Sequence, residues 1–344
     1  LSKTIRAVGS AAERFGEDYL RMLRAVRLAA QLGFSIEKET ERAIIERSSM
    51  ISNMSAERIR DEIMKIVSSE TPMIGFLLLQ YTGLLKYIMP ELLLGVGMRQ
   101  TENHAYDVYG HLLRSMQHAA DKGYDIDLRL AALLHDIAKP HTARPAGNNG
   151  YHTFYGHEVL GEKVSREILN RLKFPQHTVS RVTKLVRWHM FNSDPDQVTM
   201  SAVRRMIVNV GRENIWDLMN LRFCDRIGSG RPQEEPHRLR RYFAMIEEAM
   251  TQPTDLRMLK IGGNDVMSAT GTGPGPRVGL ILKALFGRVL DNPADNTEDK
   301  LKSVAIELSM LSTENLEIEA KRGESGMEES QEKEREDIRR KFRL

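Results

Sequence analysis

Four residues of the chain have side chains that can bind divalent metal ions: His111, the adjacent pair His135 and Asp136, and Asp225. Imidazole nitrogens and carboxylate oxygens are common ligands of such ions. The adjacent pair lies between the apolar run Leu-Ala-Ala-Leu-Leu and Ile-Ala-Lys-Pro, which predicts a buried helix that Pro140 breaks. Burying an imidazole and a carboxylate there is costly unless an ion compensates them. These residues therefore predict a metal centre.

Two further histidines, His157 and His189, lie between that pair and Asp225 in the sequence. If both bind metal, the centre holds two ions instead of one. The alternative is that each is a hydrogen-bonded core histidine, which is the usual role of a lone histidine on an apolar helix. The remaining histidines have no informative spacing, and we expect them at the surface or beside the ligands: His104, His118, His141, His152, His177 and His237.

The ligands must come from several helices. Adjacent side chains on a helix point about 100° apart, so His135 and Asp136 reach one ion only if other helices supply the remaining ligands. His111 lies in Asp-Val-Tyr-Gly-His-Leu-Leu and Asp225 in Leu-Arg-Phe-Cys-Asp-Arg-Ile-Gly, both with helical apolar spacing. Apolar residues recur three and four apart almost throughout the chain, and alternating runs of Val, Ile and Thr are rare. We predict an all-α fold with the metal centre inside a helical bundle.

The order His111, His135-Asp136, Asp225 resembles the HD superfamily of metal-dependent phosphohydrolases. His-Asp-Ile-Ala-Lys is also similar to the His-Asp-Ile-Gly-Lys variant of that superfamily, with Ala138 in place of the glycine. The resemblance implies hydrolysis of a phosphomonoester or a cyclic phosphodiester by a metal-activated water.

The same resemblance implies roles for individual residues. His157 and His189 resemble the extra ligands of two-metal members, so the implied metal ligands are His111, His135, Asp136, His157, His189 and Asp225. His135, Asp136 and Lys139 would be the catalytic residues, with Lys139 as a contact to phosphate. The implied cofactor is a divalent metal ion, either Mg, Mn, Ni or Co.

Residues 13–34 resemble another family. They read Glu-Arg-Phe-Gly-Glu-Asp-Tyr-Leu-Arg-Met-Leu-Arg-Ala-Val-Arg-Leu-Ala-Ala-Gln-Leu-Gly-Phe, which is similar to the neck of bacterial class II tRNA nucleotidyltransferases (CCA-adding enzymes) and poly(A) polymerases. In that neck a Glu-Asp-x-x-Arg motif reads the incoming base, and Glu17, Asp18 and Arg21 stand at its positions. Asp18 and Arg21, three apart, are expected to share a helix face, although such a pair is commonly only a solvated ion pair. The implied nucleotide-binding set is Asp18, Arg21, Arg24 and Arg27.

Two later segments resemble the same enzymes. Ser-Ala-Glu-Arg-Ile-Arg-Asp-Glu-Ile-Met-Lys-Ile is similar to a second neck helix, with Ser55 as its N-cap. Ile-Gly-Gly-Asn-Asp-Val-Met-Ser-Ala-Thr-Gly-Thr-Gly-Pro-Gly-Pro-Arg is similar to the tail that follows the HD domain. There a turn over 273–276 would place backbone amides beside Arg277, a candidate contact to an RNA phosphate. The alternative is a plain turn between two packed helices.

The polymerase head of that family is expected to be missing from this chain. The head carries a Gly-Ser turn followed by two metal-binding aspartates on a strand, whereas Gly9-Ser10 leads into a predicted helix. Two Asp-x-Asp pairs have the spacing of such aspartates but lie in polar segments expected to be loops: Asp125-Ile-Asp127 and Asp194-Pro-Asp196. We therefore expect that this polypeptide alone does not add nucleotides.

Composition bounds the remaining possibilities. The net charge of +3 is too small to establish nucleic-acid binding, although a local basic surface could form from Arg204-Arg205, Arg238, Arg240-Arg241 and the arginines of the neck. The single cysteine, Cys224, excludes an internal disulfide framework and is expected to be a buried thiol. No signal peptide is visible, and charges and a proline interrupt the apolar stretch over 74–98, so we predict a cytoplasmic protein without a membrane partner.

The expected organisation has four parts. These are a nucleotide-recognition and RNA-binding neck (1–98), the HD domain (99–235), a helical tail that also binds RNA (236–312), and a charged, disordered tail (313–344).

Three functions fit this reading. The first is an RNA-processing enzyme of the tRNA nucleotidyltransferase family, whose HD site trims phosphate or cyclic phosphate from RNA ends or small nucleotides. Its partners would be tRNA or other RNA, with ATP or CTP once a head is supplied. The second is a stand-alone HD phosphohydrolase acting on a nucleotide or another small phosphoester. The third is a binding module in which the HD fold only positions RNA.

Overall fold

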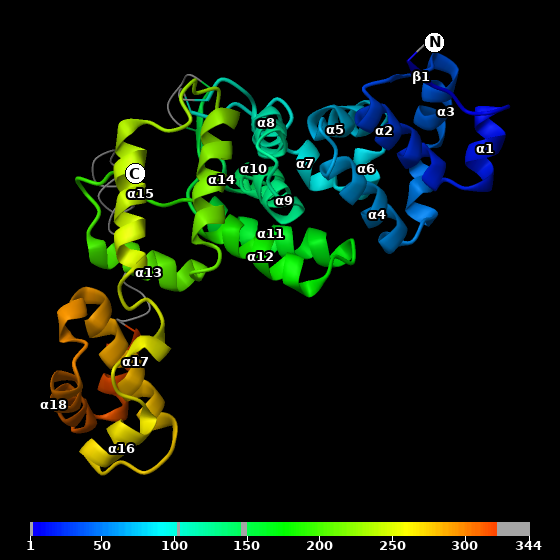
Figure 1. Ribbon diagram of the computed structural model, residues 1–344. Coiled ribbons are helices and arrows are strands. Elements are labelled where there is room, and N and C mark those ends of the chain that lie inside the picture. Colours follow the sequence, from blue (N-terminus) through cyan, green and yellow to red (C-terminus); the bar gives the residue numbers. More distant parts are fainter. Residues whose placement is uncertain (1–2, 102–103, 146–149, 322–344) are drawn as a thin grey trace. The chain divides into compact units, whose positions relative to one another are not determined.

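The computed structural model describes residues 3–101, 104–145 and 150–321 (Figure 1). The chain divides into two units, Leu1–Met190 with Trp216–Glu234, and Phe191–Ile215 with Glu235–Leu344. The regular structure of the described residues is almost entirely helical, as predicted, and the strands are two-residue pairs. None of the described helices is long and apolar enough to cross a membrane.

The N-terminal part of the first unit is a group of helices around α2. Its elements are β1 (Thr4–Ile5), α1 (Ala11–Glu17), α2 (Leu20–Leu32), β2 (Ser35–Ile36), α3 (Lys38–Arg47), η1 (Ser48–Asn53), α4 (Ala56–Val67), α5 (Pro72–Tyr81), α6 (Leu85–Ile88) and α7 (Pro90–Leu93). α2 buries an apolar face and packs on α4 and α5, because Met22, Leu23 and Val26 recur at helical spacing. It ends at Gly33, whose φ of 64° suits glycine, and β1 then pairs in parallel with β2.

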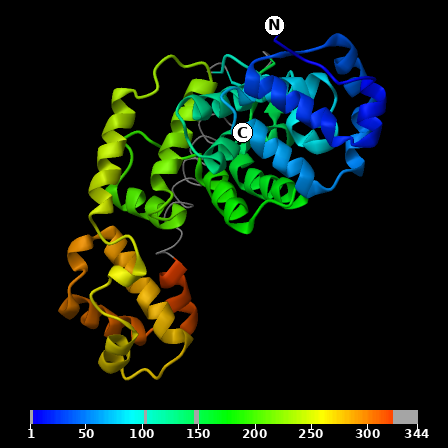
Figure 2. The same ribbon diagram turned by 45° about the vertical axis from the view of Figure 1, so that its right-hand side comes forward.

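The rest of the first unit is the helical bundle that contains the predicted ligands. Its elements are α8 (Val108–Asp121), α9 (Ile126–Leu134), α10 (Lys139–Thr142), β3 (Arg144–Pro145), β4 (His152–Thr153), α11 (His157–Arg171), α12 (Gln176–Trp188) and α14 (Ile215–Gly228). α9 lies at the centre, packed against α4, α8 and α12, and α11 lies beside α12 (Figures 1 and 2). This position explains why α9 is apolar on nearly every side.

The second unit has its own apolar core. Its elements are α13 (Met200–Val210), α15 (His237–Met250), η2 (Leu256–Met258), α16 (Gly263–Thr270), α17 (Pro276–Asp291), η3 (Pro293–Asp295) and α18 (Glu298–Ser309). α17 packs on α16 and α18, and Leu316 is fully buried in the same core. Residues 313–321 are helical. The expectation of a disordered charged tail was therefore wrong for these residues, because Leu316 adds apolar contacts that the charge-rich composition obscured. The remainder of that tail, 322–344, lies outside the described residues.

The helix that carries the His-Asp pair ends earlier than predicted. α9 stops at Leu134, His135 is its C-cap, and a turn follows before α10 begins at Lys139. Pro140 lies in the first turn of α10, where its missing N–H costs nothing, so it does not break the preceding helix. The turn places His135 and Asp136 outside a regular helix, so the angle expected between helical neighbours does not apply to them.

Asp18 and Arg21 also do not share a helix. Asp18 lies between α1 and α2 in an extended conformation, and its Oδ1 accepts a hydrogen bond from the backbone N–H of Leu20 at 3.1 Å. Aspartate is favoured at such helix starts, because its side chain satisfies an N–H that has no partner within the helix. The expectation of a common helix face was therefore wrong. Ser55 is the N-cap residue of α4, as predicted, although its side chain makes no capping hydrogen bond.

Candidate metal centre

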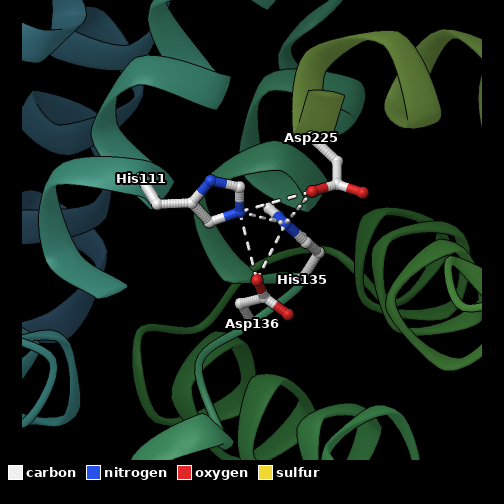
Figure 3. A group of neighbouring side chains, drawn as sticks. All are labelled: His111, His135, Asp136 and Asp225. Carbon is white, nitrogen blue, oxygen red and sulfur yellow. Dashed lines mark hydrogen bonds and ion pairs between the residues drawn. The ribbon is translucent and has the colours of Figure 1, made fainter. Parts of the chain in front are cut away.

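The six predicted ligands come together in the first unit from the ends and faces of five helices. His111 lies on the first turn of α8, His135 and Asp136 follow α9, and Asp225 lies on the last turn of α14 (Figure 3). The two further histidines flank the same place: His157 is the first residue of α11 and His189 is the C-cap of α12. Except for Asp225, these residues are at most 5% exposed.

One set of donor atoms consists of His111, His135, Asp136 and Asp225. In Figure 3, the His111 Nε2, the His135 Nε2 and one oxygen of each carboxylate point toward a common centre. The two Nε2 atoms are 2.9 Å apart, and they lie 3.1 and 3.3 Å from Asp136 Oδ2. Asp225 Oδ1 is 3.5 Å from His111 Nε2 and 3.8 Å from His135 Nε2. Donors at about 2.1 Å from one ion are themselves separated by about 3.0–3.4 Å in octahedral or tetrahedral geometry, so this set suits a single ion.

The other oxygen of Asp136 belongs to a second set. Asp136 Oδ1 is 3.1 Å from His157 Nε2 and 3.5 Å from His189 Nε2, and those two nitrogens are 3.3 Å apart. These three residues also form a group that could hold an ion. Asp136 thus offers one oxygen to each set, so its carboxylate can bridge two ions.

The hydrogen bonds of three histidines leave their Nε2 atoms available to bind a metal ion. In three of them Nδ1 faces the backbone carbonyl three residues earlier: His135 to Ala132 at 2.9 Å, His157 to Phe154 at 2.6 Å, and His189 to Val186 at 2.7 Å. A carbonyl oxygen only accepts, so Nδ1 carries the proton and Nε2 of the neutral ring has a lone pair. Two lone pairs facing each other across about 3 Å repel unless a cation or a proton lies between them.

Two polar atoms of the centre lack a hydrogen-bond partner among the described residues. They are Asp136 Oδ1 and His111 Nδ1, both fully buried. A buried acceptor without a donor is costly, and a cation at the second set would satisfy Asp136 Oδ1. The donor types, their spacing and this oxygen fit divalent metal.

The electrostatics of the centre also favour a bound cation. Burial would raise the pKa of Asp136 and Asp225, but Lys139 and His135 hold the pKa of Asp136 well below its usual range, and His135 and Arg222 do the same for Asp225. Burial alone would lower the pKa of His135, yet the two carboxylates raise it to about 9. Burial lowers the pKa of His189, which keeps that ring neutral. Both carboxylates are therefore ionised. Without an ion, the raised pKa means that His135 holds a second proton on Nε2, and a bound cation would replace this proton as the positive charge beside the carboxylates.

Lys139, the predicted phosphate contact, lies against the centre. Its Nζ is 2.5 Å from Asp136 Oδ2 and 2.6 Å from Gln100 Oε1, and the side chain is buried. Gln100 itself is 2% exposed. Sequence reasoning missed Gln100, because it precedes Lys139 by 39 residues and belongs to no motif.

Two residues of α14 support Asp225 and were also missed. Arg222 donates to Asp225 Oδ2 at 2.9 Å, which leaves Oδ1 for the metal set. Gly228 packs against the backbone of α8. Both could have been found from helical spacing, since each is three residues from Asp225 on one helix face. Cys224 is a buried thiol, as predicted, and burial raises its pKa.

The other histidines differ in their surroundings. His104 is partly buried, and its ring packs edge-on to that of His111 with centroids 5.6 Å apart. Burial and the Lys139 charge lower its pKa to about 4, so this ring is neutral. His118 Nε2 lies 3.1 Å from a carboxylate oxygen of Glu234, whereas His141, His177 and His237 are exposed. His152 contacts the backbone of Arg99.

Each predicted nucleotide-binding residue of the neck forms an ion pair with another residue of the neck. Arg21 donates to Glu17 Oε2 at 2.5 Å, whereas Asp18 Oδ2 accepts from Arg58 at 2.9 Å. Arg24 lies 3.8 Å from the buried Glu62, and Arg27 donates to that carboxylate at 2.8 Å. The Arg27 contact therefore ties α2 to α4, while Asp18, Arg21 and Arg24 keep more exposure to solvent.

The arginines of the second unit make mainly internal contacts. Arg277 lies in the first turn of α17, and its guanidinium donates to the backbone carbonyls of Ser309 and Leu311 at 2.9 and 2.5 Å. Arg204 is 4% exposed and donates to the carbonyls of Leu290 and Asp291. Its inclusion in a basic surface was therefore wrong, because it is buried and bonded within the unit.

Two family models match the chain. The HD domain model matches residues 108–227, and a model described as a probable RNA and SrmB-binding site of polymerase A matches residues 33–94. The HD match spans His111 to Asp225 and therefore includes all six ligand-type residues.

Curated relatives match a large part of the sequence. The chain is 33% identical over 282 residues to the A-adding tRNA nucleotidyltransferase of Deinococcus radiodurans, a match that covers 78% of this chain. It is 34% identical over 282 residues to the CC-adding tRNA nucleotidyltransferase of Thermus thermophilus, covering 80% of this chain. In both cases the match spans 63% of the relative's length.

A solved structure has the same fold. The CCA-adding enzyme of Bacillus stearothermophilus in complex with CTP is 22% identical, with a TM-score of 0.59, and the match covers 89% of this chain and 65% of that one. With these sequence matches, the chain belongs to the family of tRNA nucleotidyltransferases and poly(A) polymerases and contains an HD domain.

Proposed function

We propose that the chain carries the neck, HD and tail regions of a tRNA-processing nucleotidyltransferase, and that its HD centre is a metal-dependent phosphohydrolase. The observation that carries this proposal is the sharing of Asp136 between two sets of buried donor atoms, with Oδ2 facing His111 and His135 and Oδ1 facing His157 and His189. A core that only had to be stable would not need so many ionisable groups at one point.

The chemistry of such a centre is phosphoester hydrolysis. A bound divalent ion lowers the pKa of a water molecule and neutralises phosphoryl oxygens. The residues of the chain hold the centre in place: three histidines are oriented by backbone carbonyls, and Arg222 fixes which oxygen of Asp225 faces it. Lys139, beside Asp136, supplies a positive charge for an oxygen of the substrate phosphate.

The donor set favours some metals over others. One set offers two imidazole nitrogens and two carboxylates, and the other offers two imidazole nitrogens and one carboxylate. Such mixed nitrogen and oxygen ligands suit Mn, Co or Ni better than Mg, which prefers oxygen ligands. The single thiol, Cys224, is not among the donor atoms of either set. We therefore propose that the site binds Mn, Co or Ni, and that it binds Mg more weakly.

The names of the relatives suggest the partners. Both are tRNA nucleotidyltransferases, so we propose that this chain binds tRNA and that the HD centre acts on phosphate or 2′,3′-cyclic phosphate at RNA ends or on small nucleotides. Asp18, Arg21, Arg24 and Arg27 are proposed to recognise ATP or CTP. Arg277 is proposed as an RNA contact, although its guanidinium already holds the end of α18.

The experiment is a hydrolysis assay on the purified chain. After chelation, 2′,3′-cyclic AMP and p-nitrophenyl phosphate are offered with Mn, Co, Ni or Mg, beside Asp136→Asn and a surface control, Asp61→Asn. Asp61 is an exposed residue of α4 and leaves the centre unchanged. We expect metal-dependent turnover that Asp136→Asn abolishes and Asp61→Asn retains.

A substrate comparison separates the proposed function from a stand-alone enzyme. If a tRNA with a 2′,3′-cyclic phosphate end is hydrolysed with a lower KM than 2′,3′-cyclic AMP, the substrate is RNA. Equal KM values would favour a small-molecule phosphohydrolase. The absence of turnover with every metal would contradict catalysis at this centre and leave an RNA-binding module.

A further inference from the structure

Gln100 is a buried polar residue that contacts the metal centre through Lys139. Its Oε1 accepts a hydrogen bond from Lys139 Nζ at 2.6 Å, and its Nε2 donates to the carbonyl of Tyr106 at 3.3 Å. A lysine ammonium only donates, so the atom facing Lys139 must be the amide oxygen. The amide orientation therefore follows from the contact itself.

The backbone around Gln100 is fixed to the helices that carry the ligands. Asp107, the N-cap of α8, accepts from the N–H of Gly110 with Oδ1 and from the N–H of Gly97 with Oδ2, at 2.7 and 2.6 Å. Ala105 donates its N–H to the carbonyl of Ser229, just beyond α14, at 3.0 Å. The segments before and after Gln100 are thus hydrogen-bonded to the helices of His111 and Asp225. These bonds fix the backbone from which the Gln100 side chain reaches the centre.

The charge of Gln100 is as important as its position. Lys139 contacts a single carboxylate, that of Asp136 at 2.5 Å, and its second partner is the neutral amide. The ammonium has three N–H donors, and among the described residues only these two acceptors are hydrogen-bonded to it. A neutral acceptor orients the ammonium without compensating its charge.

We propose that Gln100 is a positioning residue of the phosphohydrolase centre: it holds the Lys139 ammonium so that one N–H and the positive charge face a phosphate oxygen of the substrate. This inference rests on the proposed function. A glutamate at the same position would keep the shape and the hydrogen bond but would pair with the ammonium. This glutamate would therefore weaken the binding of phosphate. Its negative charge near the metal centre would strengthen the binding of a metal cation.

The test measures the affinity for Mn²⁺ and the affinity for a phosphate ligand, because a structural defect of the centre would lower both. Isothermal titration calorimetry gives the Kd of Mn²⁺ for the metal-free chain and the Kd of adenosine 3′-monophosphate for the Mn²⁺-loaded chain, with adenosine as the ligand without phosphate. For Gln100→Glu we expect the Kd of the monophosphate to rise about tenfold, the size of one lost charge-assisted hydrogen bond, while the Kd of Mn²⁺ stays equal or falls. Adenosine binding should not change.

Two further variants make the result specific. Gln100→Asn keeps a neutral amide that is too short to reach Lys139, and it should weaken monophosphate binding without tightening Mn²⁺. Gln176→Glu adds the same charge at the exposed start of α12, about 20 Å of helix away from His189, and should change neither Kd.

Each outcome decides between the two proposals. Unchanged monophosphate affinity in both Gln100 variants, or a parallel loss of Mn²⁺ and monophosphate affinity in both, would overturn the positioning role. If the unsubstituted chain binds neither Mn²⁺ nor the monophosphate, the proposed function itself fails and this inference fails with it.

Discussion

Gly228 of α14 lies directly against His111 of α8. A Cβ at Gly228 would be 2.9 Å from the carbonyl oxygen of His111 and would overlap Ser115 Oγ, which itself donates to that carbonyl. The backbones of the two helices are therefore in contact just where Asp225 and His111 face each other at 3.5 Å. The absence of a side chain at Gly228 allows this close approach of the two helices, and so the separation of these two side chains.

Gly228→Ala is expected to weaken the metal centre. The added methyl group must push α14 away from α8, at a cost of about 1–3 kcal/mol in the free energy of unfolding. Because Asp225 lies on the displaced helix, the Kd of Mn²⁺ should rise as well. Urea unfolding and calorimetry measure the two effects.

Gly161→Ala is the matched control in the same bundle. A Cβ there would be 3.2 Å from Val186 Cγ1 and 3.6 Å from the carbonyl of His135, so a shift of a few tenths of an ångström accommodates it. We expect a small change in both quantities. Equal effects of the two substitutions would contradict a special role for the α8–α14 contact.

Asp136 and Asp225 should differ in the number of ions that their loss removes. Asp136 contributes to both donor sets and Asp225 to one. Asp136→Asn should therefore reduce binding at both sets, whereas Asp225→Asn should spare the set formed with His157 and His189. Metal content after dialysis against Mn²⁺, measured by mass spectrometry, distinguishes the two. Loss of the same number of ions in both variants would argue against a bridging carboxylate.

Removal of metal should also lower stability. An ion present at about one hundred times its Kd stabilises the folded chain by about 2.7 kcal/mol. Excess EDTA is therefore expected to lower the Tm of the unsubstituted chain and to have less effect on Asp136→Asn. The same Tm shift in both proteins would mean that the chelator acts elsewhere.

The sequence was sufficient to predict the helical fold and the six side chains that the structure brings together. Helical apolar spacing predicted the helices of His111 and Asp225, and the residue types predicted which six side chains meet. The end of α9 at Leu134 was not predicted, because the apolar run continues through Ile137 and Ala138, which are buried although they lie outside a helix.

Residues that act through tertiary contacts could not be predicted. Gln100 belongs to no motif, and only the fold brings it to Lys139. The helical spacing of its neighbours predicted that Asp18 lies on a helix. Instead its carboxylate accepts a hydrogen bond from the N–H of Leu20, and α1 ends at this residue. The spacing of apolar residues does not show where a side chain will hydrogen-bond to the backbone and end a helix.

Asp18 should make the stability of the neck depend on pH. Burial would raise its pKa, but the N–H of Leu20 and the guanidinium of Arg58 lower it below its usual value of 3.8. A carboxyl whose pKa is lower in the folded state stabilises the fold above its unfolded pKa, and this contribution is lost as the pH falls through the folded pKa. Asp18→Asn keeps an oxygen for Leu20 but has no charge. Its free energy of unfolding should therefore fall less steeply than that of the unsubstituted chain below about pH 4.

A double-mutant cycle assigns this effect to the ion pair. Arg58→Met should remove the part of the pH dependence that comes from the 2.9 Å contact with Asp18. Adding Asp18→Asn to it should then remove only the part that comes from the N–H of Leu20, a smaller change than Asp18→Asn causes in the unsubstituted chain. Parallel unfolding curves for the unsubstituted chain and Asp18→Asn across the acid range would contradict this assignment.

Arg181 joins the three helices that carry His135, His189 and Asp225. From α12 it reaches Asp217 on α14 at 2.6 Å, and Asp125 and Asp127 at the start of α9 at 2.7 and 3.3 Å. Arg181→Met would leave these carboxylates facing one another without a cation. Because the guanidinium side chain is 29% exposed, we expect a loss of about 1–2 kcal/mol in the free energy of unfolding, less than for a fully buried pair.

A second substitution tests whether repulsion among the carboxylates causes that loss. Asp217→Asn in the Arg181→Met background removes one of the facing charges, so it should restore part of the stability, whereas Asp217→Asn alone should be destabilising because it removes a partner of Arg181. Urea unfolding of the four proteins gives the coupling directly. Additive effects would show that Arg181 contributes through packing of its aliphatic stem and that charge is not what holds these helices together.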